Sequence, residues 1–292
     1  MRSSVVIISN PAARGSSRKK LADACSLIKA AGREVSMIET LGPGDATRIA
    51  AAACAERPSL VIAAGGDGTV NEVLNGMIGS ETPLAFFPLG TTNVLARELG
   101  LPTTVPEIVA RILDAEPRPV SLGRIELPRS GMSRHFCLMA GIGFDAASVY
   151  GMHKDVKKIS GETAYILSGV RNVVYYSPEE LTVSINGEER TCFSLIVGKA
   201  SRYGGDFRVT PGASLLSPSL HACFFEGHRR TDLLRYACGI VRGKHLGYRD
   251  VRVIVARELS VQGTAHVQID GDYFGRIPAR LSVAENALRL VW

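Results

Sequence analysis

Several features that define common protein classes are missing from this sequence of 292 residues. No apolar run approaches the length of a membrane-spanning helix, and the apolar run at residues 5–8 is too short for the core of a secretory signal. The six cysteines are widely spaced without a Cys-x-x-Cys pair, which argues against a disulfide framework or a zinc site. The six histidines show no metal-ligand spacing either. We therefore expect a cytoplasmic protein with reduced thiols.

Aromatic residues are also scarce, at 6% of the chain, and the basic residues are not interleaved with them. Binding of single-stranded nucleic acid usually combines basic side chains with aromatic stacking platforms, so we expect no nucleic-acid partner. Hydrophobic residues make up 46% and charged residues 21%, which is the composition of a folded globular protein. The net charge of +6 permits a nucleotide or an anionic membrane surface as a partner and selects neither.

The first third of the chain alternates short apolar runs with helical patterns. We expect strands at residues 5–9, 35–39, 60–64 and 84–87, and helices at 19–31, 45–55, from 70 onward, up to 99, and at 106–115. Repeated strand–helix units indicate a parallel sheet, whose ligands bind beyond the carboxyl ends of the strands. Asn10, Thr40, residues 65–69 and Thr91 all come just after strands. Four loops are therefore expected to converge at one edge.

The pattern changes after Pro117-Arg118-Pro119. Strands are expected at residues 120–127, 136–140, 181–185, 192–197, 220–225, 251–256, 259–261 and 267–270, with only two helices, at 161–175 and 232–244. Several of these runs alternate or are rich in β-branched residues. We therefore predict an α/β plus all-β protein, with a parallel-sheet domain at residues 1–118 and a β-rich domain at 119–280.

The strongest chemical signal is Gly65-Gly66-Asp67-Gly68-Thr69, which joins a buried strand to a helix and is followed at once by Asn71 and Glu72. Glycines let the backbone approach an anion, and the N–H groups at a helix start point toward it. A carboxylate beside phosphate oxygens repels them unless a cation lies between. Asp67 therefore predicts Mg²⁺ bound with a nucleotide. An ordinary strand-to-helix turn is the less favoured alternative.

The β-rich part offers weaker signals, each with a structural alternative. Asp270-Gly271-Asp272 is typical of a hairpin turn, but a kinase needs a carboxylate to orient or deprotonate the acceptor hydroxyl. Arg202-Tyr203-Gly204-Gly205 fits a β-bulge or a close approach to a ligand equally well. Residues 226–252 hold seven basic against three acidic residues around an amphipathic helix, which indicates a solvated face or a membrane-surface contact.

Residues 61–73 resemble the nucleotide-binding signature of the diacylglycerol kinase catalytic-domain family, which includes soluble bacterial lipid kinases, sphingosine kinases and ceramide kinases. Asn10-Pro11 with Gly15 resembles its first phosphate loop, and Pro88-Leu89-Gly90-Thr91-Thr92-Asn93 its third. The motifs at residues 202–205 and 270–272 fall where its second domain carries matching ones. The resemblance covers essentially the whole chain in order.

The resemblance implies an ATP-dependent lipid kinase that works at the inner membrane surface on a diacylglycerol-like or sphingoid/ceramide-like lipid. It implies a nucleotide domain similar to those of phosphofructokinase and NAD kinase, to which residues 281–292 return, a β-sandwich domain, and a cleft between them. Asp67 would handle Mg²⁺ and phosphate, and Asp272 would stand where the family usually has a glutamate as general base. ATP would be bound by Asn10, Gly15, Thr40, Gly65, Gly66, Asp67, Gly68, Thr69, Asn71, Glu72, Thr91 and Asn93.

The sequence departs from the family pattern in four places. Asp272 is one methylene shorter than glutamate, and Ser121 and Val94 stand where many members have aspartate. Leu216-Ser217-Pro218 replaces an Asp-Asp-Gly turn that holds a structural Mg²⁺ in bacterial members. We therefore expect no structural metal there, and packing of Leu215 and Leu216 in its stead. A protein that binds nucleotide and lipid without catalysis is the alternative function, and NAD kinase is less favoured because Asn71-Glu72 follows the glycines directly.

Overall fold

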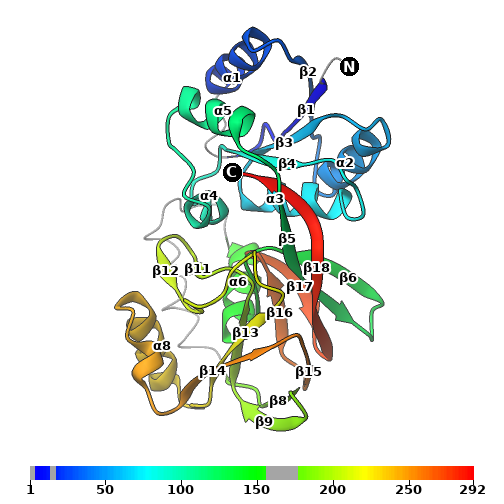
Figure 1. Cartoon of the computed structure of the whole chain (residues 1–292). Coiled ribbons are helices and arrows are strands. Elements are labelled where there is room, and N and C mark those ends of the chain that lie inside the picture. Colours follow the sequence, from blue (N-terminus) through cyan, green and yellow to red (C-terminus); the bar gives the residue numbers. More distant parts are fainter. Residues whose placement is uncertain (1–3, 14–17, 156–176) are drawn as a thin grey trace. The chain divides into compact units, whose positions relative to one another are not determined.

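The computed structural model describes residues 4–13, 18–155 and 177–292 (Figure 1). The chain divides into two compact units, Met1–Leu122 with Glu285–Trp292, and Gly123–Ala284. The C-terminal residues therefore belong to the first unit. The expected helix at residues 161–175 lies outside the described residues.

The first unit is a parallel sheet with helices on both faces (Figure 1). Its sheet order is β2-β1-β3-β4, followed by the end of β18, which runs parallel to β4. The strands are β1 (Ser4–Ser9), β2 (Glu34–Glu39), β3 (Leu60–Gly65), β4 (Leu84–Pro88) and β18 (Ala279–Val291). The helices are α1 (Arg18–Ala30), α2 (Asp45–Ala55), α3 (Asp67–Gly76), α4 (Val94–Glu98) and α5 (Val105–Asp114). One hydrophobic cluster joins α1 and α5 to the sheet, while α2 and α3 pack against each other and against β3.

The strand register of this sheet brings the loops after the strands together. Ser9 in β1 lies opposite both Glu39 in β2 and Ala64 in β3, and Gly65 lies opposite Pro88 in β4. All four strands therefore end at nearly the same level. Every residue of β3 is buried, which is expected where both faces of a parallel sheet are covered.

The second unit contains two antiparallel sheets. One has the order β14-β13-β10-β7-β16-β17, and the other contains β18-β15-β8-β9 together with β5 and β6. Their strands are β5 (Arg118–Leu127, which begins in the first unit), β6 (Met132–Phe136), β7 (Met139–Gly143), β8 (Leu181–Ile185), β9 (Glu188–Cys192), β10 (Ser194–Gly198), β13 (Leu220–Phe225), β14 (Val251–Ala256), β15 (Glu258–Gln262), β16 (His266–Ile269) and β17 (Asp272–Arg276). The remaining elements are the hairpin β11 (Arg202–Tyr203) and β12 (Phe207–Arg208), the helices α6 (Phe144–Asp155) and α8 (Arg230–Val241), and the 3₁₀ turn η1 (His245–Gly247). A single apolar core takes side chains from both sheets, as in a β-sandwich.

Two apolar runs that were expected to be single strands, residues 136–140 and 192–197, are corners between the sheets. The first is divided between β6 and β7 and the second between β9 and β10, and in each case the two strands belong to different sheets. Such a corner cannot be recognised in the sequence, because the residues on both sides of it pack into the same core and form one unbroken apolar run. The helix α6 directly after β7 was not expected.

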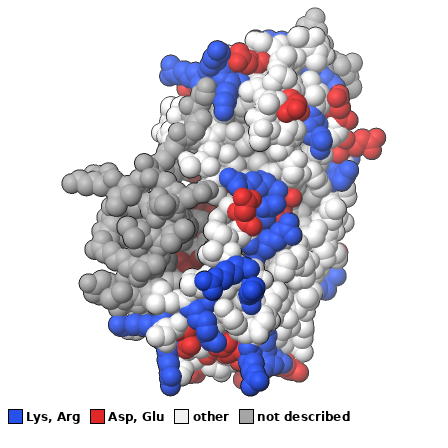
Figure 2. Space-filling model, turned by 90° about the vertical axis from the view of Figure 1, so that its left-hand side faces the viewer, with Lys and Arg blue, Asp and Glu red and all other residues white. Residues whose placement is uncertain are grey.

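Helix α8 packs through a different face from the one expected. The amphipathic helix expected here has Leu233, Leu234, Ala237, Ile240 and Val241 on its predicted apolar face. The buried residues of α8 are instead Leu233, Tyr236 and Gly239. Leu234 is 41% exposed and Val241 56% exposed. Figure 2 looks onto the side that carries α8, and in its lower part basic side chains are spread over the surface, with uncharged surface and some acidic side chains between them.

Candidate active site

One glycine allows a tight turn from β3 into α3, and another lets the loop after β4 pack closely against that turn. A side chain at Gly65 would place its Cβ 2.4 Å from Thr69 Oγ1, and one at Gly90 would place it 2.7 Å from the Gly66 Cα. No real Cβ tolerates such distances, so both positions require glycine. The Leu89 N–H donates to the Gly65 carbonyl at 2.7 Å and fixes the two loops together.

Asp67, the first residue of α3, joins the same two loops through its carboxylate. Its Oδ2 accepts a hydrogen bond from the Val94 N–H at 2.9 Å, and its Oδ1 accepts one from the Leu95 N–H at 3.0 Å. These donors are the first two N–H groups of α4, so Asp67 caps that helix. Sequence reasoning assigned Asp67 only to a cation and missed this second role.

The same carboxylate fits Mg²⁺ that arrives with a nucleotide. An ionised carboxylate has about four lone-pair directions, so a carboxylate of this kind can accept N–H groups and hold a cation at the same time. Mg²⁺ usually takes one or two carboxylates plus phosphate oxygens and water. The described ranges contain no group of three or more His, Cys, Asp or Glu side chains that could hold a metal by themselves. A single carboxylate such as Asp67 therefore suits an ion that also takes ligands from a bound nucleotide.

The loops after β1 and β2 reach the same edge. Asn10 Nδ2 donates to Thr69 Oγ1 at 3.2 Å, and Asn10 Oδ1 accepts from the Ala12 N–H at 2.9 Å. Thr40 is buried, and its N–H donates to the Ser9 carbonyl at 2.9 Å. Gly68 lies in the first turn of α3. The structure thus brings these predicted residues together, whereas Gly15 lies outside the described residues.

Asn93 and Thr91, in the loop after β4, have different environments. Asn93 adopts a left-handed backbone (φ 47°) and exchanges two hydrogen bonds with Gly90, at 2.9 and 2.8 Å. Its amide therefore shapes the loop. Thr91 is exposed, so it is the side chain of the two that is open to a ligand.

Glu72, which the resemblance assigned to ATP binding, contacts the start of α2. Its carboxylate accepts hydrogen bonds from the Gly44 N–H at 2.9 Å and the Ala46 N–H at 3.2 Å, at the start of α2. Asn71 is buried and accepts from Asn75 Nδ2 through its own carbonyl oxygen at 2.8 Å. Glu72 thus joins α3 to the start of α2, whereas this bond of Asn71 lies within α3.

The two carboxylates of the Asp270-Gly271-Asp272 turn have different environments. Asp270 is buried with φ 48°, and its carboxylate accepts the N–H groups of Cys137, Leu138 and Met139 at 3.0, 2.9 and 2.9 Å. These bonds hold the corner between β6 and β7. The Asp272 side chain is 46% exposed and lies 3.9 Å from Arg134 Nη2. Asp272 is therefore the carboxylate of the pair that a substrate can reach.

Asp145, at the start of α6, was missed by sequence reasoning. It is buried, and it accepts hydrogen bonds from the Tyr203 hydroxyl and, at 2.5 Å, from Gln268 Nε2. Gln268 Oε1 in turn accepts the Gly271 N–H at 2.9 Å. A chain of side chains thus leads from the β11–β12 hairpin to the turn before Asp272. The only sequence signals were the glycine break at residues 204–205 and an acid just after an apolar run.

Asp145→Asn should change how stability depends on pH. Burial raises the pKa of Asp145 to about 6, so the carboxyl favours folding below its usual pKa and loses that contribution as the pH rises through 6. The variant should therefore gain about 2 kcal/mol of unfolding free energy relative to wild type between pH 4.5 and 7.5. Urea unfolding across this range measures the difference. Asp206→Asn, which changes an exposed carboxylate of the neighbouring hairpin, is the matched control. If the stability of Asp145→Asn and of the wild type changed with pH in the same way, the raised pKa assigned to Asp145 would be wrong.

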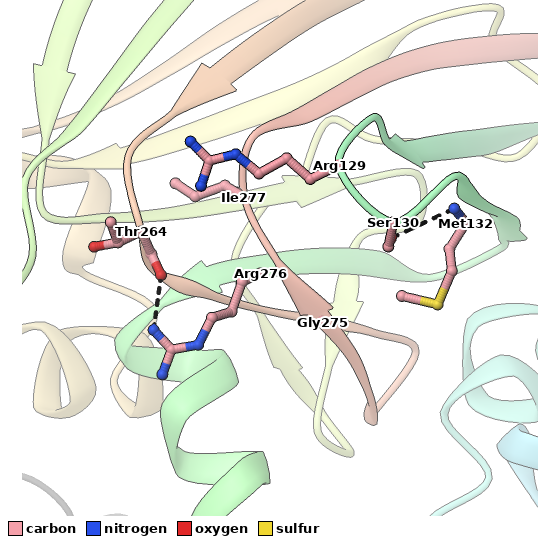
Figure 3. Close-up of a pocket in the computed structure, with 7 residues that line it drawn as sticks. All are labelled: Arg129, Ser130, Met132, Thr264, Gly275, Arg276 and Ile277. Atoms are coloured by element: carbon pink, nitrogen blue, oxygen red, sulfur yellow. Dashed lines mark hydrogen bonds between the residues drawn. The ribbon is translucent and has the colours of Figure 1, made fainter.

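A pocket of about 430 Å³ lies along β17 (Figure 3). Its lining residues are Arg129, Ser130, Met132, Thr264, Gly275, Arg276 and Ile277. Arg276 Nη1 donates to the Thr264 carbonyl at 3.0 Å. The strands β6 and β17 contribute Met132 and Gly275 to this pocket, and they also carry Arg134 and Asp272. The pocket and the exposed carboxylate therefore lie along the same two strands.

Comparison with known proteins covers both units. The diacylglycerol kinase catalytic domain model matches residues 4–125, and the YegS C-terminal NAD kinase beta sandwich-like domain model matches residues 139–292. The diacylglycerol kinase of Bacillus subtilis is 29% identical over 280 residues, which are 93% of this chain and 90% of that protein. The diacylglycerol kinase of Mycobacterium tuberculosis is 30% identical over 266 residues, which are 89% of this chain and 85% of that protein.

A crystal structure of a diacylglycerol kinase from Bacillus anthracis has the same fold, with a TM-score of 0.78 at 23% identity over 100% of this chain and 97% of that one. The predicted fold class, a parallel-sheet domain followed by an antiparallel β domain, is therefore confirmed. The predicted family is confirmed by two models that together match most of the chain and by relatives that cover nearly all of it. This chain belongs to the diacylglycerol kinase family of lipid kinases.

Proposed function

We propose that this protein transfers the γ-phosphoryl group of ATP to a hydroxyl group of a diacylglycerol-like or sphingoid/ceramide-like lipid. The observation that carries the proposal is the set of loops at the carboxyl edge of the parallel sheet, where Asp67 and Thr69 begin α3 and Asn10, directly after β1, donates to Thr69. Glycine backbone and helix N–H groups there suit the phosphates of ATP. Mg²⁺ held at Asp67 would offset the charge on those phosphates.

Asp272 is the proposed general base. One of its carboxylate oxygens takes the proton of the lipid hydroxyl while the lipid oxygen attacks the γ-phosphorus, and the bond to the β,γ-bridging oxygen breaks to release ADP. The chain from Tyr203 through Asp145 and Gln268 to Gly271 supports the turn that carries this base. The adjacent pocket combines Met132 and Ile277 with arginines, which suits an amphipathic acceptor.

The direct test is transfer of radiolabel from γ-labelled ATP, with Mg²⁺, to separate micelles of diacylglycerol, ceramide and a long-chain base. We expect labelled product from at least one lipid with the wild-type protein and at least about 100-fold less with Asp272→Asn. Retained ATP binding without a product from any lipid would overturn the kinase assignment and favour a protein that binds nucleotide and lipid without catalysis.

The proposed route to the substrate is peripheral binding to an anionic membrane through α8. Leu234 and Val241 on α8, and Leu246 on η1, expose 41%, 56% and 42% of their surface. Arg242, Lys244 and Arg249 flank them. None of the described helices has the length and apolar character needed to cross a bilayer. All six cysteines are free thiols, which supports placement at the inner, cytoplasmic surface.

Val241→Asp should weaken binding to vesicles that contain acidic lipids. The change removes an exposed apolar contact and adds a negative charge at a surface where each basic residue contributes about 1 kcal/mol. Binding of the wild type should also fall as salt is added, since salt screens surface charges. Co-sedimentation measures both effects. Leu41→Asp, at a residue 93% exposed in the first unit, is the matched control, and equal binding by the two variants would remove α8 from the contact.

A further inference from the structure

Lys199, directly after β10, is a fully buried cation in the second unit. Its exposed fraction is 0%. Its Nζ donates hydrogen bonds to the carbonyl oxygens of Ser214 at 2.5 Å and Ser217 at 2.7 Å, both in the turn between β12 and β13. Burial lowers the pKa of Lys199 to about 8, so the ammonium form predominates at neutral pH.

The resemblance described above implies that this turn stands where bacterial members of the family carry an Asp-Asp-Gly metal turn. Residues 213–218 include no carboxylate, and Asp206, the nearest acid in the sequence, pairs with Arg202 at 2.7 Å. Mg²⁺ in proteins normally takes at least one carboxylate, so these residues do not fit the ion. Our expectation that Leu215 and Leu216 hold the turn is half wrong, because Leu215 is buried but Leu216 is 56% exposed.

We propose that the Lys199 ammonium replaces a structural metal ion in this turn, so that the second unit folds without a divalent cation. Two carbonyl oxygens that point at one centre need a hydrogen-bond donor or a cation between them, since carbonyls shielded from water without a partner destabilise the fold. A tethered ammonium supplies that charge within the chain. A divalent cation would have to displace it, because the two cannot occupy the same site.

The same lysine connects this turn to the turn that carries the proposed base. The backbone N–H groups of Lys199 and Ala200 both donate to the Leu138 carbonyl, at 2.8 and 3.0 Å. The Leu138 N–H donates to Asp270 Oδ1 at 2.9 Å. Loss of the ammonium should therefore loosen the β6–β7 corner as well as the 214–217 turn. The proposal does not depend on kinase activity, because unfolding tests it.

The first experiment compares thermal unfolding of the nucleotide-free wild-type protein with EDTA and with excess Mg²⁺. We expect the two curves to superimpose, because the carbonyl site is filled by the chain itself. A rise of several degrees with Mg²⁺ alone would show that a divalent ion still binds and would overturn the proposal. This comparison needs no variant, so it holds even if the variants do not fold.

The second experiment removes the charge. Lys199→Met keeps most of the side-chain length, and we expect it to lower Tm by at least about 5 °C. Lys244→Met, at an exposed residue of the same unit, is the control and should melt like wild type. Lys199→Ala should regain Tm, or its folded state, with methylammonium chloride but not with sodium chloride at equal ionic strength. Equal melting of both methionine variants, or no difference between the two salts, would contradict the proposal.

Discussion

Asp67→Asn is expected to lower kcat for phosphoryl transfer by about 1000-fold or more. The carboxylate is the one charged side chain that our assignment gives to the metal and phosphates, and an amide can neither hold Mg²⁺ as well nor offset its charge. The variant also loses one acceptor for the two N–H groups of α4, because its Nδ2 is a donor. That loss should cost about 1 kcal/mol of stability, which is far less than the catalytic effect. Steady-state kinetics at saturating ATP measures the catalytic effect, and a thermal melt of each protein measures the loss of stability.

Asp45→Asn is the matched control for that experiment. Asp45 also lies at a helix start in the first unit, and its carboxylate accepts the Leu41 N–H at 2.8 Å and pairs with Arg48. It should cost similar stability and leave kcat nearly unchanged. If Asp67→Asn retained more than about a tenth of the wild-type kcat, which corresponds to less than about 1.4 kcal/mol, the proposed role of Asp67 would be wrong.

Asp272→Asn is expected to lose catalysis, whereas Asp270→Asn is expected to lose stability. Asp272→Asn should lower kcat by about 100-fold to 10,000-fold while ATP affinity and Tm stay unchanged, because a base acts on the hydroxyl and its side chain is half exposed. Asp272→Glu should remain active, since it keeps a carboxylate that can act as a base. Calorimetry measures the nucleotide affinity of each variant, and steady-state kinetics with the lipid that the wild type phosphorylates measures kcat.

Asp270→Asn should instead destabilise the fold. Its carboxylate accepts three backbone N–H groups in a buried corner, and an amide can satisfy only part of them. Each buried donor left without a partner costs about 1–3 kcal/mol, so the free energy of unfolding should fall by about 3 kcal/mol. An Asp270→Asn variant as stable as wild type but inactive would show that the catalytic carboxylate is Asp270 and not Asp272.

The parallel-sheet unit was predictable from the sequence because its signals are local. Apolar runs of four or five residues, glycine stops and helical spacing each occupy one short window, and the helices and strands of this unit fall within a few residues of the expected positions. The convergence of four loops also followed from strand direction alone. The β-rich unit was harder, because an apolar run inside a sandwich looks the same whether it is one strand or a corner between sheets.

The sequence by itself determined the family, the fold class and the glycine loop around Asp67, since these depend on residue order and local backbone requirements. Only the tertiary structure decided which carboxylate of the 270–272 turn is buried, that Asp145 joins Tyr203 and Gln268, and that Lys199 fills a carbonyl site. The partners in these contacts lie from 15 to 133 residues apart in the chain. No periodic pattern encodes such pairs. A buried polar group must still find a partner, and the folded chain alone determines which partner lies within reach.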